Sequence, residues 1–230
     1  MDNQNMARRM NRFESKNELD LALFNRIMSD LSHAIMTKNY ATLLLSGGST
    51  PKGLLKLLSN GNIDWSKVTV GLVDERFVPV SSDSSNEKLI RDSFLINKAK
   101  KSTFIPMVFQ INNVLENLKS IERAYSVFKT CDVIVLGMGE DGHTASLFPN
   151  DLNSELAFET TDLVVLTNAP KMPIHRISCS PFLLNSASNL YLMITGRKKK
   201  LILDKAIELN LPLGEFIPQI KEIYFTDKEL

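Results

Sequence analysis

Two patterns of apolar positions alternate along this chain, namely short unbroken apolar runs and longer stretches with helical spacing. Leucine and isoleucine recur every three or four positions over residues 13–36, which predicts an amphipathic helix. The unbroken runs predict strands at 41–45, 68–73, 132–136, 163–166, 190–194 and 222–225. Further helices are expected from Pro51 through Leu58, over 86–96 and 113–128, and from Gly196 through Ile207.

This order of elements predicts an α/β fold. Strands that alternate with helices and read as continuous apolar runs are typical of a mostly parallel, open, Rossmann-like sheet with helices on both faces. The 230 residues show no internal repeat, low-complexity tract or Pro/Gly linker, so we expect a single domain over 1–230.

Polar clusters follow the predicted strands. They occupy 46–50, 74–76, 137–143, 168–176 and 195–199, whereas a loop at the opposite strand ends, 59–65, shows only turn-forming residues. Ligands of such folds bind beyond the carboxyl ends of the strands. We therefore expect these five clusters to form one site.

The cluster at 137–143 has the composition of a catalytic loop. His143 can exchange protons near neutral pH, and Asp141, two residues earlier, could orient it as a general base. The glycines also match the dinucleotide pattern GxGxxG, but Pro149 follows within two turns and an ionisable histidine replaces a small residue. A plain turn with a surface histidine is the other alternative. Asp141 and His143 alone make no metal site, so we expect neither metal nor cofactor.

Ser46, Gly47, Gly48, Ser49 and Thr50 lie between a strand and a helix start. Free backbone N–H groups, the helix dipole and hydroxyls favour an anion there. The segment lacks the Lys-Ser/Thr ending of a nucleotide P-loop, which favours a phosphomonoester. Alternatively, it is a glycine turn with Thr50 as the N-cap.

Cations follow two other strands. Lys199 lies in a basic run, 197–200, at a predicted helix start. Positive charge at that end of a helix is unfavourable to the helix dipole unless a bound anion offsets it. We expect Lys198 and Lys200 to be solvated. Arg176 is either a second cation for a phosphate or part of a loop salt bridge.

Asp74 and Arg76 could position a sugar hydroxyl and an anionic or carbonyl oxygen, because a carboxylate accepts and a guanidinium donates in a fork. Glu75, between them, could instead form an ion pair that closes the strand.

Charge and composition narrow the class of protein. The formal net charge of +1 gives no general attraction to nucleic acid or anionic membranes. No apolar run is long enough to span a bilayer or to form a signal peptide. Cys131 and Cys179 lie far apart and form no disulfide framework or metal spacing. We expect a cytoplasmic monomer that binds a small molecule.

Five segments together carry a resemblance to a known family. They are LSGGSTPKGLLKLL, VDERFVPVSSDSSN, DVIVLGMGEDGHTASLFP, PKMPIHRIS and MITGRKKK. In this order they resemble the 6-phosphogluconolactonases, within a wider fold family that includes glucosamine-6-phosphate deaminase and ribose-5-phosphate isomerase. The resemblance implies hydrolysis of 6-phospho-D-glucono-1,5-lactone to 6-phospho-D-gluconate, the second step of the oxidative pentose phosphate pathway.

The resemblance also implies residue roles. His143 would be the base, Ser46 to Thr50 with Arg176 and Lys199 would hold the phosphate, and Asp74 and Arg76 would lie near the sugar. Lys199 is chosen over its neighbours because the family places a lysine three residues after the glycine, here Gly196.

Two related activities are the alternatives. Deaminases follow Asp-Gly-His with a stretch that ends Phe-Asn-Glu-Pro, but residues 146–149 contain no glutamate, and Arg76 stands where deaminases carry an aromatic residue. A non-catalytic sugar-phosphate sensor would need a helix-turn-helix, for which the segment before Phe13 leaves no room. The chain departs from the lactonases at Glu87, where a tyrosine is common, and in a shortened segment between 106 and 131.

In the expected mechanism His143 takes a proton from water and later returns one to the ring oxygen, while Asp141 holds the imidazole. Ser146 lacks the elbow motif of a nucleophile. The oxyanion partner stays open between the backbone N–H groups of 137–142 and Arg76.

Overall fold

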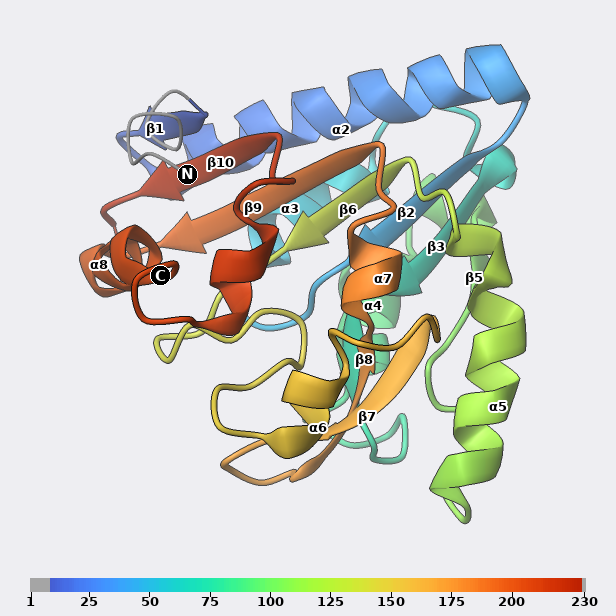
Figure 1. The fold of residues 1–230 in the computed structure, drawn as a ribbon. Coiled ribbons are helices and arrows are strands. Elements are labelled where there is room, and N and C mark those ends of the chain that lie inside the picture. The colour runs from blue at the N-terminus through green and yellow to red at the C-terminus, as the bar shows by residue number, and fades with distance from the viewer. Residues whose placement is uncertain (1–8, 229–230) are drawn as a thin grey trace.

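The computed structural model describes residues 9–228 and contains two sheets (Figure 1). The larger has seven strands in the order β1-β10-β9-β6-β2-β3-β5, and every neighbouring pair is parallel. Its strands are β1 (Met10–Phe13), β2 (Ala41–Leu45), β3 (Val68–Leu72), β5 (Thr103–Phe104), β6 (Val133–Leu136), β9 (Asn189–Thr195) and β10 (Glu222–Thr226). The smaller sheet is antiparallel, in the order β4 (Asp74–Arg76), β8 (His175–Cys179) and β7 (Val164–Asn168).

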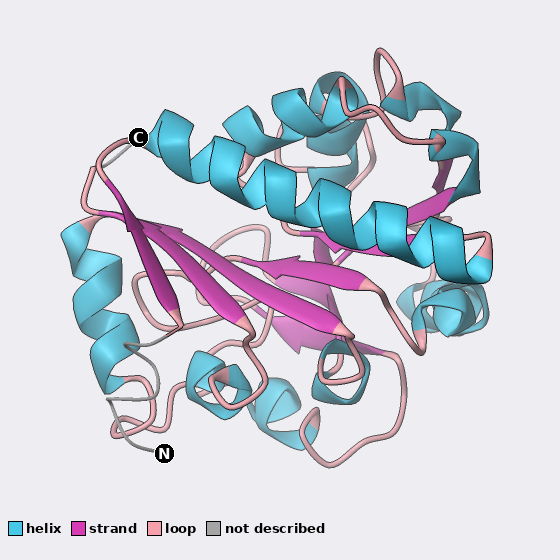
Figure 2. Ribbon diagram, turned by 90° about the horizontal axis from the view of Figure 1, so that it is seen from above, coloured by secondary structure: helices cyan, strands magenta, loops and turns pink. Residues whose placement is uncertain are grey.

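Helices cover both faces of the parallel sheet (Figure 2), which confirms the predicted α/β class. The α-helices are α2 (Lys16–Lys38), α3 (Lys52–Ser59), α4 (Asn86–Ser93), α5 (Val114–Ala124), α6 (Leu152–Leu156), α7 (Pro181–Leu184) and α8 (Arg197–Lys205). Short 3₁₀ helices are η1 (Trp65–Lys67), η2 (Ala99–Lys101), η3 (Tyr125–Phe128) and η4 (Pro212–Phe216). Among the helices of residues 9–228, none is both long enough and apolar enough to cross a membrane.

One part of the apolar core lies between α2 and the parallel sheet. Leu19, Leu23, Ile27 and Leu31 form the apolar stripe of α2 and are fully buried, each stabilising the fold by about 2 kcal/mol relative to an exposed side chain. All five residues of β2 are buried as well, as expected of a strand covered on both faces. Trp65 is also buried in the core.

The strand order locates the site. From β2 the chain continues to β3 and β5 on one side, then returns to β6 on the other side of β2 and proceeds to β9 and β10. Strand order therefore reverses between β2 and β6, and a ligand crevice is expected outside their carboxyl ends.

Two sequence-based expectations are wrong. The strand at 163–166 does not join the parallel sheet: β7 pairs antiparallel with β8, which in turn pairs with β4, so 168–176 holds the turn of a β-hairpin together with the adjoining strand ends. An apolar run alone does not reveal its partner strand. The first helix does not begin at Phe13, which lies in β1; Ser15 is its N-cap and accepts a hydrogen bond from Glu18 N–H at 3.2 Å.

Candidate active site

A cavity of about 250 Å³ opens at the carboxyl ends of β2 and β6, beside the small sheet. Most of the predicted site residues line it: Gly47, Gly48, Ser49, Thr50, Asp74, Arg76, His143, Arg176 and Lys199. Asp141 lies behind His143 and contacts it directly. The structure thus brings together all five polar clusters, although the cluster at 168–176 reaches the cavity from the small sheet.

His143 is held by its own loop. Its Nδ1 lies 2.5 Å from Asp141 Oδ1, and its backbone N–H donates to the same oxygen at 3.2 Å. A Cβ on Gly139 would lie 2.3 Å from both Nδ1 and Cε1 of His143, so the imidazole rests where only glycine leaves room. The Phe148 ring packs against the imidazole at 4.6 Å between centroids. With Nδ1–H donated to Asp141, Nε2 is the ring nitrogen left to accept a proton.

Asp141 is suited to this role because it stays ionised. Burial acts to raise its pKa, but the hydrogen bond and charge of His143 outweigh burial and hold the pKa of Asp141 below its ordinary value. The carboxylate can therefore fix the Nδ1–H tautomer and stabilise the imidazolium.

The turn before α3 presents an uncapped helix N-terminus to the cavity. The N-cap position is Pro51 and no side chain caps the helix, so the alternative in which Thr50 is the N-cap is wrong. Gly48 has a φ of 90°, which favours glycine. Gly47 approaches Asn86 so closely that a Cβ would lie 1.9 Å from Asn86 Oδ1. These features leave N–H groups and the helix dipole available to an anion.

Ser46 connects the two loops at the switch point. Its hydroxyl donates to the Val135 carbonyl at 2.8 Å and accepts from Gly137 N–H at 3.1 Å. This hydroxyl is already used within the protein, so Ser46 serves the site by holding the β2 and β6 loops together.

Lys199 reaches the cavity from the first turn of α8, whose N-cap is Gly196 with a φ of 90°. Burial lowers the pKa of Lys199, against the opposing effect of Glu140 and Asp141. Lys198 is exposed as expected. Lys200 is partly exposed and pairs with Asp204 at 2.6 Å on the surface of α8, in keeping with a solvated position.

Two arginines face each other in the small sheet. Arg76 and Arg176 are cross-strand partners of β4 and β8. Arg176 is only 8% exposed; its Nε donates to the Pro173 carbonyl at 2.8 Å, and its guanidinium lies 5.7 Å from the Phe148 ring centroid. Burial, and next the charge of Arg76, lower the pKa of Arg176.

The arginine pair has spare donors. Arg76 Nη1 donates to the Ser84 carbonyl at 2.6 Å, but its Nε is buried without a hydrogen-bond partner among residues 9–228. No salt bridge joins Arg176 to an acidic residue in the described chain, so the alternative of a loop salt bridge is wrong. Two adjacent cations with spare donors, Arg176 buried and Arg76 partly buried, favour an anionic ligand.

Asp74 and Glu75 have different roles. Asp74 lines the cavity, and its carboxylate accepts from the Ser146 hydroxyl at 2.6 Å. Glu75 does not form an ion pair; its side chain is 1% exposed and points away from the cavity. Its carboxylate accepts hydrogen bonds from the backbone N–H groups of Arg76, Asn86 and Glu87 and from the Ser85 hydroxyl. Burial raises the pKa of Glu75 against these hydrogen bonds. It braces β4 against α4.

The sequence did not assign Asn86, Ser146 or Phe148 to the site. Asn86 contacts Gly47 and donates to the Asp74 carbonyl at 2.9 Å. Ser146 is fully buried and bonded to Asp74, which leaves no exposed hydroxyl for nucleophilic attack. Their positions depend on contacts between distant segments. The only sequence feature that points to these three residues is their position within the motifs quoted above.

The arrangement can support acid–base chemistry on an anionic substrate. An imidazole backed by a carboxylate shares one cavity with an uncapped helix N-terminus, two arginines and a lysine. The basic groups can bind and orient the anion, and the imidazole can move a proton at the bond next to it.

The family described as glucosamine-6-phosphate isomerases/6-phosphogluconolactonase matches residues 14–219. A curated relative named 6-phosphogluconolactonase from Rhizobium meliloti (strain 1021) is 40% identical over 87% of this chain and 88% of its own length. One from Helicobacter pylori (strain ATCC 700392 / 26695) is 36% identical over 90% of each. The crystal structure of a 6-phosphogluconolactonase from Shewanella baltica OS155 superposes with a TM-score of 0.90 at 33% identity and covers 94% of this chain and 97% of that one.

Proposed function

Since this chain belongs to the glucosamine-6-phosphate isomerase/6-phosphogluconolactonase family, we propose that it is an enzyme that hydrolyses 6-phospho-D-glucono-1,5-lactone to 6-phospho-D-gluconate, the second step of the oxidative pentose phosphate pathway. The observation that carries the proposal is the Asp141–His143 pair in one cavity with Arg76, Arg176 and the N-terminus of α3. A phosphorylated lactone needs both a base and an anion site within one cavity.

His143 is the general base of this reaction. Its Nε2 takes a proton from water as the water oxygen attacks the lactone carbonyl carbon, which forms a tetrahedral oxyanion. The intermediate then collapses, the bond from that carbon to the ring oxygen breaks, and the imidazolium returns the proton to the ring oxygen. Asp141 holds Nδ1–H throughout. Lactone and water are thereby converted to the open-chain acid with no other reactant.

The remaining residues bind the substrate. The turn of Gly47, Gly48, Ser49 and Thr50, with Lys199 and Arg176, holds the phosphate; the uncapped α3 helix and the charge of Lys199 support this role. Asp74 and Arg76 lie near the sugar. The buried, unpartnered Nε of Arg76 supports this residue as a donor to a substrate oxygen.

The test offers the protein 6-phosphogluconolactone and glucosamine 6-phosphate in separate assays. We expect lactone hydrolysis above the spontaneous rate and no release of ammonia. The His143→Ala protein measures the background in the same buffer. Ammonia release without lactone hydrolysis would identify a deaminase, and phosphate-ester binding without either reaction would identify a sensor.

We also infer one domain acting as a cytoplasmic monomer without nucleic-acid partners. The cavity combines residues from both sheets, which supports one domain. Cys131 and Cys179 are buried free thiols, which is consistent with a reducing compartment. The near-neutral net charge supports the absence of nucleic-acid binding.

A further inference from the structure

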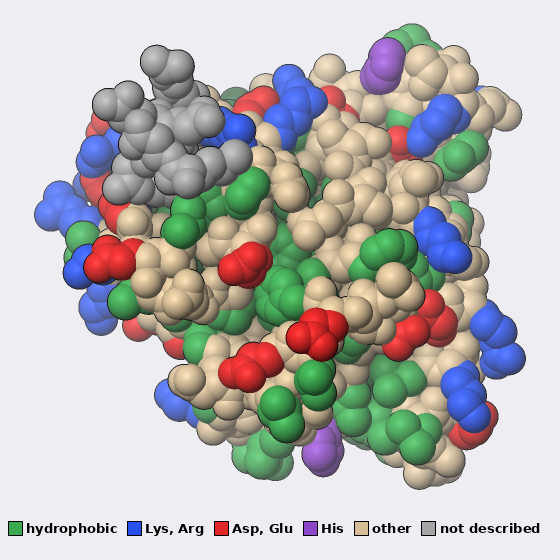
Figure 3. All heavy atoms as spheres, viewed as in Figure 1, with side chains coloured by type: hydrophobic (Ala, Val, Ile, Leu, Met, Phe, Trp, Pro, Cys, Tyr) green, Lys and Arg blue, Asp and Glu red, His purple; other side chains and the backbone are tan. Residues whose placement is uncertain are grey.

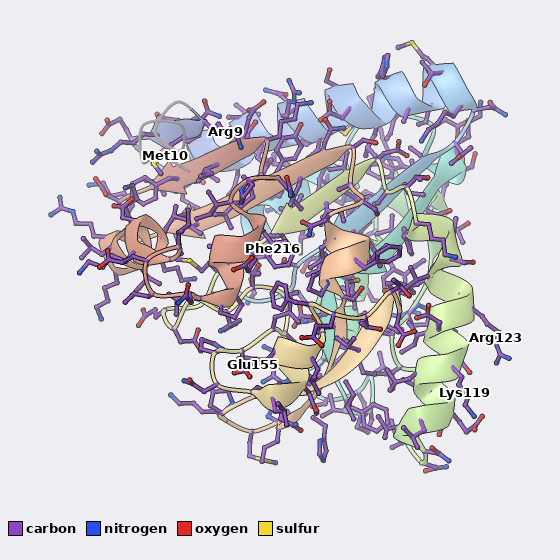
Figure 4. All side chains as sticks on the ribbon, in the orientation of Figure 1. Arg9, Met10, Lys119, Arg123, Glu155 and Phe216 are labelled. Carbon is purple, nitrogen blue, oxygen red and sulfur yellow. The ribbon has the colours of Figure 1, made fainter. Side chains whose placement is uncertain are left out.

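A second cavity, of about 540 Å³, lies between α6 and η4 on the other side of Phe148 from the catalytic cavity. In Figure 4, Glu155 on α6 and Phe216 on η4 lie to either side of this region. The rings of Phe158 and Phe216 are 6.0 Å apart between centroids and hold the two elements together. We name this cavity the α6–η4 groove.

Apolar side chains and two carboxylates line the α6–η4 groove, together with the neutral polar residues Asn150, Ser154 and Asn210. Phe148, Phe158, Leu209 and Leu211 supply apolar surface, whereas Glu155 and Glu215 supply carboxylates. Figure 3 shows hydrophobic and acidic side chains gathered over the same lower part of this face. Both glutamates are exposed and neither forms a salt bridge with any residue of 9–228. Among those residues no lysine or arginine lines the groove.

We propose that the α6–η4 groove binds a small organic cation, an ammonium group carried on an apolar alkyl or aryl body. An apolar body gains by leaving water for the phenylalanine and leucine side chains. The two carboxylates attract a cation, give a neutral analogue no advantage, and repel an anion. The catalytic cavity has the opposite sign, since arginines and a lysine line it, so one ligand does not suit both sites.

The groove also contacts the catalytic loop. Phe148 packs on the His143 ring at 4.6 Å and lies under Arg176. Leu211 is so close to Gly142 that a Cβ there would lie 2.5 Å from Leu211 Cδ1, and Leu213 N–H donates to the Gly142 carbonyl at 3.2 Å. A ligand against Phe148 and Leu211 therefore alters the position of His143, and the site is regulatory. The regulatory role of the groove rests on the proposed function.

The probe is 4-phenylbutylamine, with 4-phenylbutanol and 4-phenylbutyrate as neutral and anionic analogues of the same body. We expect the wild-type protein to bind the amine about five- to tenfold more tightly than the alcohol by calorimetry, with the butyrate weakest. Methyl resonances of Leu209 and Leu211 should shift on titration. In Glu155→Gln/Glu215→Gln, amine affinity should fall to that of the alcohol while alcohol affinity is unchanged.

Glu159→Gln is the matched control, because Glu159 is also exposed, follows α6 and does not line the groove. It should bind the amine like the wild type. Equal binding of amine and alcohol, no binding of the amine, or unchanged amine affinity in the double variant would each overturn the site. These binding measurements use no lactone, so their outcome does not depend on whether the protein hydrolyses it.

A separate assay tests the coupling. Amine at saturation should change kcat or KM for the lactone at least about twofold, and the double variant should need about five- to tenfold more amine than the wild type to reach the same change. Binding without any change in rate would overturn the regulatory part and leave the binding site in place.

Discussion

The catalytic cavity has two walls of different construction. The parallel-sheet wall consists of the turns 46–50 and 137–143, each a continuous segment after one strand. The small-sheet wall consists of Asp74, Arg76 and Arg176, from strands about a hundred positions apart. In the first wall glycines set the geometry, since the imidazole rests on Gly139. In the second wall the charged side chains, two of them buried, determine the affinity for the substrate.

This difference has an energetic consequence. Asp74 and Glu75 raise the pKa of Arg176, but burial and the neighbouring Arg76 outweigh them and lower it. Keeping the Arg176 guanidinium charged and buried beside Arg76 lowers the free energy of unfolding of the ligand-free protein, and a bound anion offsets that loss. The part of the parallel-sheet wall that holds His143 should therefore respond to mutation in turnover, and the small-sheet wall in substrate affinity.

His143→Ala should have the largest effect. Loss of the general base should lower kcat/KM for the lactone about a thousandfold. The fold should persist, because the side chain is 32% exposed and lies in a loop. Initial rates corrected for spontaneous hydrolysis measure the loss, and binding of 6-phosphogluconate is the control. Activity within tenfold of the wild type would remove His143 from the mechanism.

Gly139→Ala should have the next largest effect. The new methyl group would lie 2.3 Å from the imidazole and displace it, so kcat should fall about a hundredfold with a smaller change in KM. Gly137→Ala is the matched control, since no atom lies within 4 Å of its Cβ position. It should keep kcat, with any effect confined to KM. Equal kcat values in the two variants would show that the Gly139 contact does not position the base.

Arg176→Met tests the small-sheet wall. Removing one of the paired guanidinium groups should raise KM about tenfold with little change in kcat. The free energy of unfolding in urea should stay within about 1 kcal/mol of the wild type. The variant loses the hydrogen bond from Arg176 to the Pro173 carbonyl, but it no longer buries a charge or places two guanidinium groups side by side. A loss of several kcal/mol would instead make Arg176 a structural residue.

The two walls also differ in how far the sequence predicts them. The catalytic loop and the anion-binding turn are contiguous motifs between a strand and the next element, so their residues could be named from residue type and position after a strand. The small sheet could not be predicted, because β8 was not recognised and its pairing with β4 depends on contacts between distant segments. Asn86 and Ser146 were missed for the same reason. β5 has two residues, too few for any hydrophobic period.

Lys199 reaches the cavity from α8 and should show the smallest effect, as a pH dependence. Burial lowers its pKa, so the ammonium should lose its proton at a lower pH than an ordinary lysine, and phosphate affinity should weaken as pH rises through that pKa. We expect the Kd of 6-phosphogluconate, measured by calorimetry, to rise a few-fold before the pH reaches the ordinary lysine pKa of about 10.4. Lys199→Arg should shift this weakening to higher pH, because a guanidinium stays charged throughout. Coincident profiles in the two proteins would show that residue 199 does not carry the charge that the phosphate meets.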